Sequence, residues 1–470
     1  MTARSAIGKD IASGGALAIA AAVRAGQASA VQIAEAALAR IEADDPALNS
    51  FTTVTAERAL AEARAVDARR AQGYDPGPLA GVPYAVKNLF DIAGITTVAG
   101  SKIDAERPPA AADATAVRRL AEAGAVLVGA LNMDEYAYGF TTENTHYGPA
   151  RNPHDRDRIA GGSSGGSGNA VAGGLVPLSL GSDTNGSIRV PSSLCGLFGL
   201  KPTYGRLSCA RAFPFVVSLD HLGPLARSPR DLALSYDAMQ GPDPEDAVCT
   251  DRAAEPVAGF LDRGTAGLRI AVAGGYFRKG AFPEALTAVE RVATFLGASR
   301  EIELPEVGRA RAAAYVITAT EGAALHIGRL RTRANDFDPA VRDRLIAGAM
   351  VPATAVNRAQ KFRRWYRAEV LALFDEVDAI LAPATPCTAP LIGQETFVLD
   401  GVETPLRANL GLFTQPISFI GLPVVAVPVP LAPLPIAVQV IAAPWREDVA
   451  LRIARALEAG GVCAAPRPNF

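Results

Sequence analysis

The sequence predicts an α/β fold: one large domain whose central mixed sheet is covered by helices on both faces. Two observations lead to this prediction. Short apolar runs that fit buried strands alternate with longer segments that fit amphipathic helices, and this alternation is typical of sheets flanked by helices. No internal repeat, linker or break in composition divides the 470 residues. We therefore expect a single domain over 1–470, where length alone would allow two or three.

The domain is expected to begin with helices over 10–70, to hold its core over roughly 75–240, and to be completed by 245–470. The predicted helices have helical spacing of apolar residues or an N-capping side chain; they are 29–43 (capped by Ser29), 55–70, 113–123 (capped by Asp113) and 446–458. The predicted strands share short apolar runs and are 83–86, 125–128, 176–180, 268–273, 377–381, 424–427 and 436–441.

Composition narrows the function classes. Hydrophobic residues make up 49% of the chain and charged residues 20%, as in a soluble globular protein. The net charge of −2 gives no sign of binding to nucleic acid or to an anionic membrane. The N-terminus lacks the apolar core of a signal peptide. The cysteines are scattered, which fits reduced thiols in the cytoplasm; they are Cys195, Cys209, Cys249, Cys387 and Cys463.

The uncharged segment between Arg407 and Arg446 is long enough to span a bilayer. Many prolines interrupt it, and no continuous helix passes through that many. Buried strands over 424–427 and 436–441 explain the apolar character better, so we expect no membrane span.

Two glycine-serine blocks and one lysine are the strongest functional signal. The blocks are 161–168 (GGSSGGSG) and 183–189 (DTNGSIR), and Lys87 ends an apolar run. Serine hydroxyls in glycine-rich turns beside a lysine can be activated without histidine, which indicates amide hydrolysis through a covalent acyl-enzyme. A flexible linker or a phosphate-binding loop fits less well, because no spacer surrounds the first block and no phosphate-binding spacing is present.

Other interpretations of these residues are open. Residues 161–165 also satisfy G-x-S-x-G, the nucleophile elbow of α/β-hydrolases, for which His221 after Asp220 is the only plausible base. Lys87 could equally be a solvated lysine at a strand end. No histidine cluster has metal-ligand spacing, so we expect neither a metal nor another cofactor.

The order and spacing of three blocks resemble the amidase signature family: 81–91 (GVPYAVKNLFD), 158–168 (RIAGGSSGGSG) and 181–204 (GSDTNGSIRVPSSLCGLFGLKPTY). The resemblance covers nearly the whole chain. It implies that Ser187 attacks the amide carbon, that Ser163, usually preceded by a cis peptide bond, relays the proton, and that a neutral Lys87 accepts it. It also implies an oxyanion hole from the backbone N–H groups of Thr184, Asn185, Gly186 and Ser187. Asp183 and Arg189 flank this loop and are expected to brace it by an ion pair.

Within the family, residues 133–144 (MDEYAYGFTTEN) resemble the glutaminase A component of tRNA-dependent amidotransferases. Residues 144–155 (NTHYGPARNPHD) and 182–189 (SDTNGSIR) more closely resemble bacterial 1-carboxybiuret hydrolases of cyanuric acid degradation. The second resemblance implies a small anionic ureido substrate, release of ammonia, a small helical partner like the amidotransferase C subunit, and an oligomer. The alternatives are a catalytically silent scaffold and a glutaminase subunit; the intact Lys87–Ser163–Ser187 set argues against the scaffold.

Substrate recognition is predicted at a cluster of arginines over 329–344. A guanidinium can donate two parallel hydrogen bonds to one carboxylate. Residues 341–344 (VRDR) also resemble the segment of the amidotransferase glutaminase that carries the arginine for the glutamine carboxylate. Arg344 is therefore the first choice, with Met133 and Asn185 as further candidates for substrate contact. The alternative is that these arginines form a solvated helix face.

Overall fold

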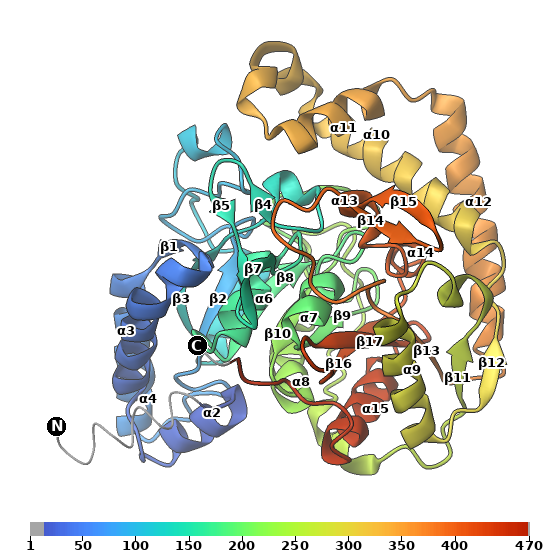
Figure 1. Cartoon of the computed structure of the whole chain (residues 1–470). Coiled ribbons are helices and arrows are strands. Elements are labelled where there is room, and N and C mark those ends of the chain that lie inside the picture. The colour runs from blue at the N-terminus through green and yellow to red at the C-terminus, as the bar shows by residue number, and fades with distance from the viewer. Residues whose placement is uncertain (1–13, 469–470) are drawn as a thin grey trace.

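The computed structural model describes residues 14–468 and confirms the predicted α/β class. The main sheet has eleven strands, with these bounds: β1 Phe51–Val54, β2 Pro83–Lys87, β3 Val126–Leu131, β8 Leu178–Ser182, β9 Phe198–Lys201, β10 Leu222–Ala226, β11 Ile270–Ala273, β12 Arg300–Ile302, β13 Ala379–Pro383, β16 Val424–Val429 and β17 Ile436–Ala442. Their order is β1-β3-β2-β8-β10-β9-β16-β17-β13-β11-β12. Strands from both halves of the chain share this sheet, as expected for one large domain (Figure 1).

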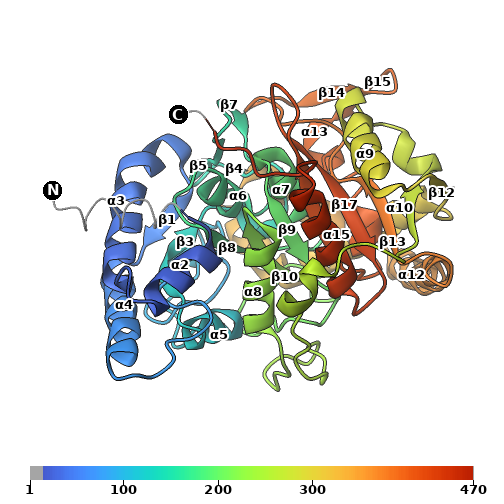
Figure 2. The same cartoon turned by 90° about the horizontal axis from the view of Figure 1, so that it is seen from below.

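Helices flank the sheet and have these bounds: α2 Ala16–Arg24, α3 Ala30–Leu48, α4 Ala56–Ala71, α5 Thr115–Glu122, α6 Gly165–Ala172, α7 Arg189–Cys195, α8 Pro229–Met239, α9 Pro283–Leu296, α10 Val307–Arg333, α11 Pro339–Ala349, α12 Ala353–Leu373, α13 Leu406–Asn409, α14 Gln415–Ser418 and α15 Glu447–Ala459. Helix α8 packs on β10 and β9, α15 on β16 and β17, and α9 on β17, β13 and β11 (Figure 2). The long α10 packs against α11 and α12 and also reaches α14, and these helices lie in the upper right of Figure 1.

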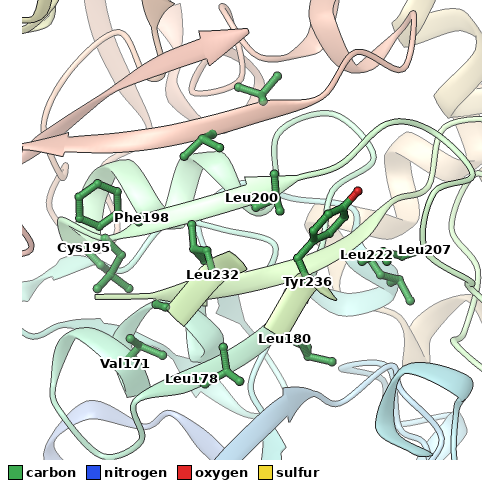
Figure 3. Close-up of a cluster of buried hydrophobic side chains, with 14 of the residues drawn as sticks. Val171, Leu178, Leu180, Cys195, Phe198, Leu200, Leu207, Leu222, Leu232 and Tyr236 are labelled. Atoms are coloured by element: carbon green, nitrogen blue, oxygen red, sulfur yellow. The ribbon is translucent and has the colours of Figure 1, made fainter. Parts of the chain in front are cut away.

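The middle of the sheet is closed by a continuous apolar core. Leucine and phenylalanine side chains of β8, β9 and β10 meet Leu232 and Tyr236 of α8 and Val171 of α6 (Figure 3). These side chains are almost completely buried. Removal of so much apolar surface from water is the main force that holds the central strands in place.

Strands β3, β2 and β8 run parallel and lie side by side, with β2 in the middle. Their carboxyl ends therefore meet at one edge of the sheet, where open α/β sheets bind their ligands. Lys87 is the last residue of β2 and Ser182 is the last residue of β8. The sheet thus brings together two residues that are far apart in the sequence.

All seven predicted strands are present within a few residues of their expected bounds. Four strands of the main sheet were not predicted: β1, β9, β10 and β12. Their sequences explain this, because β9 and β10 contain glycine, β10 also contains Pro224, and β1 and β12 are short strands without a buried residue. The apolar segment before Arg446 forms β16 and β17, and no helix in residues 14–468 is long and apolar enough to cross a membrane.

One predicted helix start is confirmed and another is wrong. Ser29 caps α3, and Gln32 completes a capping box; the helix continues past Ala43 to Leu48. Asp113, in contrast, does not cap α5, which begins after Ala114. The Asp113 carboxylate instead accepts two hydrogen bonds from Arg58, each 2.7 Å long, because a charged bidentate contact outcompetes a cap. Residues 10–13 of the predicted helical region lie outside the described residues.

Candidate active site

Lys87 lies at the centre of a buried polar cluster. Its Nζ is 2.6 Å from Ser163 Oγ and 2.9 Å from Ser182 Oγ. Lys87 and Ser163 are fully buried and Ser182 is 4% exposed. A solvated lysine at a strand end is thereby excluded, and the first glycine-serine block is joined to the end of β2. Ser182 lies next to the second glycine-serine block, but no local pattern indicates that its hydroxyl faces the lysine.

The peptide bond between Gly162 and Ser163 is cis, as the family resemblance implies. The carbonyl oxygen of Ser163 accepts a hydrogen bond of 3.2 Å from the Asp134 N–H. A Cβ atom on Gly162 would lie 2.2 Å from Asp134 Oδ2 and 2.7 Å from the backbone nitrogen of Thr141. Only glycine fits at this position, because the surrounding backbone approaches so closely.

Burial lowers the pKa of Lys87 from 10.5 to about 7, although the carboxylates of Asp134, Asp220 and Asp183 favour its charged form. A lysine removed from water loses the solvation of its ammonium, so its neutral amine becomes accessible near neutral pH. Nζ can then accept a proton from the neighbouring Ser163 hydroxyl. The geometry and the pKa agree in making Lys87 a candidate base.

The loop from Thr184 to Ser187 connects β8 to α7 and lines a cavity. Within residues 14–468, the four backbone N–H groups of this loop donate to no protein acceptor, and Ser187 is 3% exposed. Unpaired backbone donors that face a cavity are the arrangement of an oxyanion hole. No hydrogen bond joins Ser187 Oγ to Ser163 Oγ in the described part of the chain; such contacts often tighten only when substrate is bound.

A buried ion pair braces this loop, as predicted. Arg189 donates to both carboxylate oxygens of Asp183 over 2.9 Å, from Nε and from Nη2. Both side chains are fully buried. Burial opposes ionisation of Asp183, but the Arg189 guanidinium outweighs it and holds the pKa of the carboxyl well below its usual value. Arg189 also donates to Gln439 Oε1 over 2.7 Å, which ties the loop to β17.

Thr414, the residue before α14, contacts the same loop. Its Oγ1 donates to the carbonyl oxygen of Asn185 over 2.7 Å. Gly186 has φ of 142°, and a Cβ on it would lie 2.1 Å from Thr414 Oγ1. The Asn185 side chain donates from Nδ2 to Thr318 Oγ1 over 3.0 Å, and its buried Oδ1 has no partner among the described residues.

The cavity brings Ser187 together with residues from several elements. Its lining is Ala137, Tyr138, Gly139, Phe140, Thr184, Asn185, Ser187, Phe215, Tyr315, Thr318, Arg344 and Gln415. Arg344 Nη1 donates to the carbonyl oxygen of Tyr138 over 2.9 Å, and its guanidinium carbon lies 3.6 Å from the centroid of the Tyr138 ring. These contacts hold the guanidinium against Tyr138, another residue that lines the cavity of Ser187.

Arg344 differs from the other arginines of the predicted cluster. Arg329 and Arg333 bind Asp104 and Glu106, respectively, Arg342 binds the adjacent Asp343, and Arg331 is exposed. Arg344 forms no ion pair with an acid anywhere in residues 14–468. The solvated-face alternative therefore describes Arg331, whereas Arg329, Arg333 and Arg342 are held in ion pairs.

Two further candidates lie elsewhere. Met133 is fully buried in the main apolar core and is not among the residues that line the Ser187 cavity. His221 is 3% exposed, and its Nδ1 lies 2.6 Å from the Leu219 carbonyl oxygen and 3.0 Å from that of Asp183. Burial lowers the pKa of His221 well below its usual value. This histidine contacts the backbone beneath the loop, so the nucleophile-elbow interpretation lacks its base.

Comparison with known proteins agrees with this geometry. The amidase family profile matches residues 32–451. AtzE of Pseudomonas sp. (strain ADP), a subunit of 1-carboxybiuret hydrolase, is 57% identical over 443 residues, covering 94% of this chain and 97% of the relative. The A subunit of the glutamyl-tRNA(Gln) amidotransferase of Azotobacter vinelandii (strain DJ / ATCC BAA-1303) is 43% identical, covering 84% of this chain and 89% of the relative.

Solved structures give the same result. One is described as an unexpected vestigial protein complex that reveals the evolutionary origins of an s-triazine catabolic enzyme; it has a TM-score of 0.95 and 56% identity, covering 96% of this chain and 100% of that one. A bacterial aryl acylamidase of the amidase signature family has a TM-score of 0.87 and 26% identity, covering 96% of each chain. The chain therefore belongs to the amidase signature family and is a hydrolase of amide C–N bonds.

Proposed function

We propose that this enzyme hydrolyses the terminal amide of 1-carboxybiuret, a small anionic ureido compound, and releases ammonia. One observation carries the proposal: Arg344 lines the same cavity as Ser187 and has no acidic partner in the described structure. A guanidinium can donate two parallel hydrogen bonds to one carboxylate, and an anionic substrate would supply the negative charge that Arg344 lacks as a partner. The similarity to the Pseudomonas hydrolase supports the same substrate.

The chemistry follows from the buried cluster. Ser187 Oγ attacks the carbonyl carbon of the terminal carbamoyl group, and its proton passes through Ser163 to the neutral amine of Lys87. The backbone N–H groups of the Thr184–Ser187 loop stabilise the oxyanion of the tetrahedral intermediate. Lys87 then returns the proton through Ser163 to the leaving –NH₂, and ammonia departs.

The second half of the reaction restores the enzyme. A water molecule attacks the acyl group on Ser187, and its proton passes to Ser163 or directly to the lysine base. The C–O bond to Ser187 breaks, and the carbamoyl group leaves as a carboxylate. One water is consumed and one ammonia is formed for each substrate, and no step involves oxidation or reduction.

A substrate panel tests the proposal. Purified enzyme is incubated with 1-carboxybiuret, with biuret and with glutamine, and ammonia is measured over time. We expect kcat/KM for 1-carboxybiuret to exceed the other two by about 100-fold or more, since biuret would leave the half-buried Arg344 guanidinium without a carboxylate partner. Faster release from glutamine would overturn the proposal in favour of a glutaminase role.

We also propose a small helical partner, similar to the amidotransferase C subunit. Two relatives are themselves named as subunits, and a solved relative is described as a protein complex. Mass measurement of the enzyme purified from its native host should find a small second chain in a fixed ratio. Recovery of the full-length chain alone, with full activity, would contradict this proposal.

A further inference from the structure

Gln415 occupies a position in the cavity that the sequence did not single out. It begins α14 and follows Thr414, whose hydroxyl binds the carbonyl of Asn185 in the Ser187 loop. Gln415 is 2% exposed and lines the same cavity as Ser187 and Arg344. A buried amide side chain at a ligand cavity needs partners for its donor and its acceptor.

The protein satisfies only one end of this amide. Gln415 Oε1 accepts a hydrogen bond of 2.8 Å from Arg311 Nε. Because a guanidinium N–H can only donate, this contact fixes which end of the amide is oxygen. Gln415 Nε2 consequently points away from Arg311, and within residues 14–468 it donates to no protein group. The cavity is thus presented with an N–H donor of fixed orientation.

Arg311 is itself held firmly. Its Nη2 donates to the Ala408 carbonyl oxygen over 2.8 Å and to Asn409 Oδ1 over 2.7 Å. Its guanidinium carbon lies 5.5 Å from the centroid of the Tyr315 ring, and Tyr315 lines the cavity. No carboxylate in the described structure binds it. Arg311 therefore acts through Gln415 as a positioning residue.

We propose that Gln415, oriented by Arg311, donates its Nε2 hydrogen bond to an internal carbonyl oxygen of the substrate and thereby selects for acyl ureas. This inference rests on the proposed function and adds a third recognition point. The loop N–H groups take the scissile carbonyl, Arg344 takes the carboxylate, and Gln415 takes the carbonyl between them. Glutamine offers no internal carbonyl between its carboxylate and its amide, only methylenes and an ammonium-bearing carbon, so the Gln415 donor would be left unpaired.

Two stable ligands isolate this contact. Oxalurate carries a carboxylate, an internal carbonyl and a terminal carbamoyl group; ureidoacetate is the same molecule with a methylene in place of the internal carbonyl. Both are titrated by calorimetry into the Ser187→Ala variant, which cannot turn them over. We expect oxalurate to bind about 10-fold more tightly, the usual advantage when one buried donor finds its acceptor.

Variants at Gln415 and Arg311 test whether the tighter binding of oxalurate comes from the Gln415 donor. In the Ser187→Ala background, Gln415→Met removes the donor, and Gln415→Glu removes it while keeping the acceptor for Arg311. Both should bind the two ligands equally well, and the charge of Gln415→Glu cancels in the ratio because each ligand has one carboxylate. Arg311→Met should also abolish the preference, whereas a merely structural loss would weaken both ligands alike. Gln72→Met, at an exposed glutamine, is the matched control.

The outcomes are separable. Loss of the oxalurate preference in the Gln415 variants, with unchanged unfolding temperatures, supports the inference; if Gln415→Met fails to fold, Gln415→Glu decides. A preference that survives both variants, or no preference in the Ser187→Ala parent, overturns it. Failure of the proposed function is detected separately, as absence of ammonia release from 1-carboxybiuret by the unmodified enzyme.

Discussion

The site has two parts that are built differently: a buried polar cluster, here called the floor, and two residues that line the Ser187 cavity, here called the wall. The floor consists of Lys87, Ser163 and Ser182, which lie at the ends of parallel strands or in the loop beside them and are at most 4% exposed. The wall consists of Arg344 and Gln415, which are carried by helices from the last third of the chain. Hydrogen bonds join the side chains of the floor directly to one another. Each wall residue is instead held by a hydrogen bond to a neighbouring residue and keeps an N–H donor that has no partner in the described structure.

This difference separates two tasks. Burial of the floor lowers the pKa of Lys87 to about 7, which bond cleavage requires whatever the rest of the substrate is. The wall does not touch the reacting groups and can only distinguish one substrate from another. Changes in the floor should thus impair every substrate, and changes in the wall should impair only those substrates that carry the matching group.

The largest effect is expected at the nucleophile. Ser187→Ala removes the hydroxyl that we propose forms the acyl-enzyme, so ammonia release should fall by about 10⁴-fold or more on every substrate, with the fold intact. Steady-state ammonia assays, with circular dichroism as a check of folding, test this. Ser299→Ala, at an exposed serine, is the control. Near-normal turnover by Ser187→Ala would remove Ser187 from the mechanism.

The base comes next. Lys87→Ala should lose about 10³-fold or more in kcat. In the unmodified enzyme, only neutral Lys87 can accept the proton, and burial lowers its pKa to about 7. The rate of the chemical step should therefore rise with pH through about 7 and level off above it, as measured in single-turnover experiments. A flat profile across this range would argue against a titrating Lys87, and Lys279→Ala, at an exposed lysine, serves as the control.

A smaller loss is expected when the oxyanion loop is deformed. Gly186→Ala places a Cβ 2.1 Å from Thr414 Oγ1 at a φ of 142°, so the loop must shift. Displacement of one oxyanion donor costs about 10²- to 10³-fold in kcat. Gly94→Ala has a positive φ as well but meets nothing within 4 Å, and its kcat should stay close to normal. Equal kinetics for the two variants would show that the loop N–H groups do no catalytic work.

Most of the proposed catalytic residues were predictable from the sequence because they lie in contiguous, unusual blocks. Lys87, Ser163 and Ser187 could be named from glycine-serine spacing and family resemblance. The contact of Ser182 with Lys87 could not, because it depends on β8 lying in register beside β2. The wall was harder still: Gln415 and Arg311 are ordinary residues on separate helices, and no local pattern shows that they meet. Arg344 was found only through the resemblance.

The fold likewise contains some elements that local sequence patterns predict and others that only tertiary contacts produce. Strands with uninterrupted apolar runs were predicted, whereas β9 and β10 were missed although they lie at the centre of the sheet. Their glycine and proline residues locally indicate turns, and only burial between neighbouring strands makes them strands. Asp113 illustrates the converse error: the local pattern predicted a cap, but Arg58, distant in the sequence, binds the carboxylate.

At the wall, Arg344→Lys keeps the charge but loses the planar fork. It should lower kcat/KM for 1-carboxybiuret by about 10- to 100-fold, since a bidentate charged contact becomes a single one. Activity on biuret, which has no carboxylate, should change by less than about 3-fold. Arg331→Lys, at an exposed arginine of the same cluster, should affect neither substrate.

The smallest expected effect lies at the edge of the floor. Ser182→Ala removes one of the two hydroxyls beside Lys87 Nζ, at 2.9 Å. The lysine keeps its contact with Ser163 but loses part of its orientation, so kcat should fall by about 10-fold. The loss should be the same for 1-carboxybiuret and for biuret, because the two substrates do not differ at the reacting amide.

The most direct test of the account is to measure kcat/KM for 1-carboxybiuret and for biuret with three proteins side by side: the unmodified enzyme, Ser182→Ala and Arg344→Lys. The division between floor and wall predicts that Ser182→Ala leaves the ratio of the two values unchanged, whereas Arg344→Lys lowers that ratio by about 10-fold or more. An equal reduction of both values by Arg344→Lys, or a changed ratio in Ser182→Ala, would contradict this division of roles.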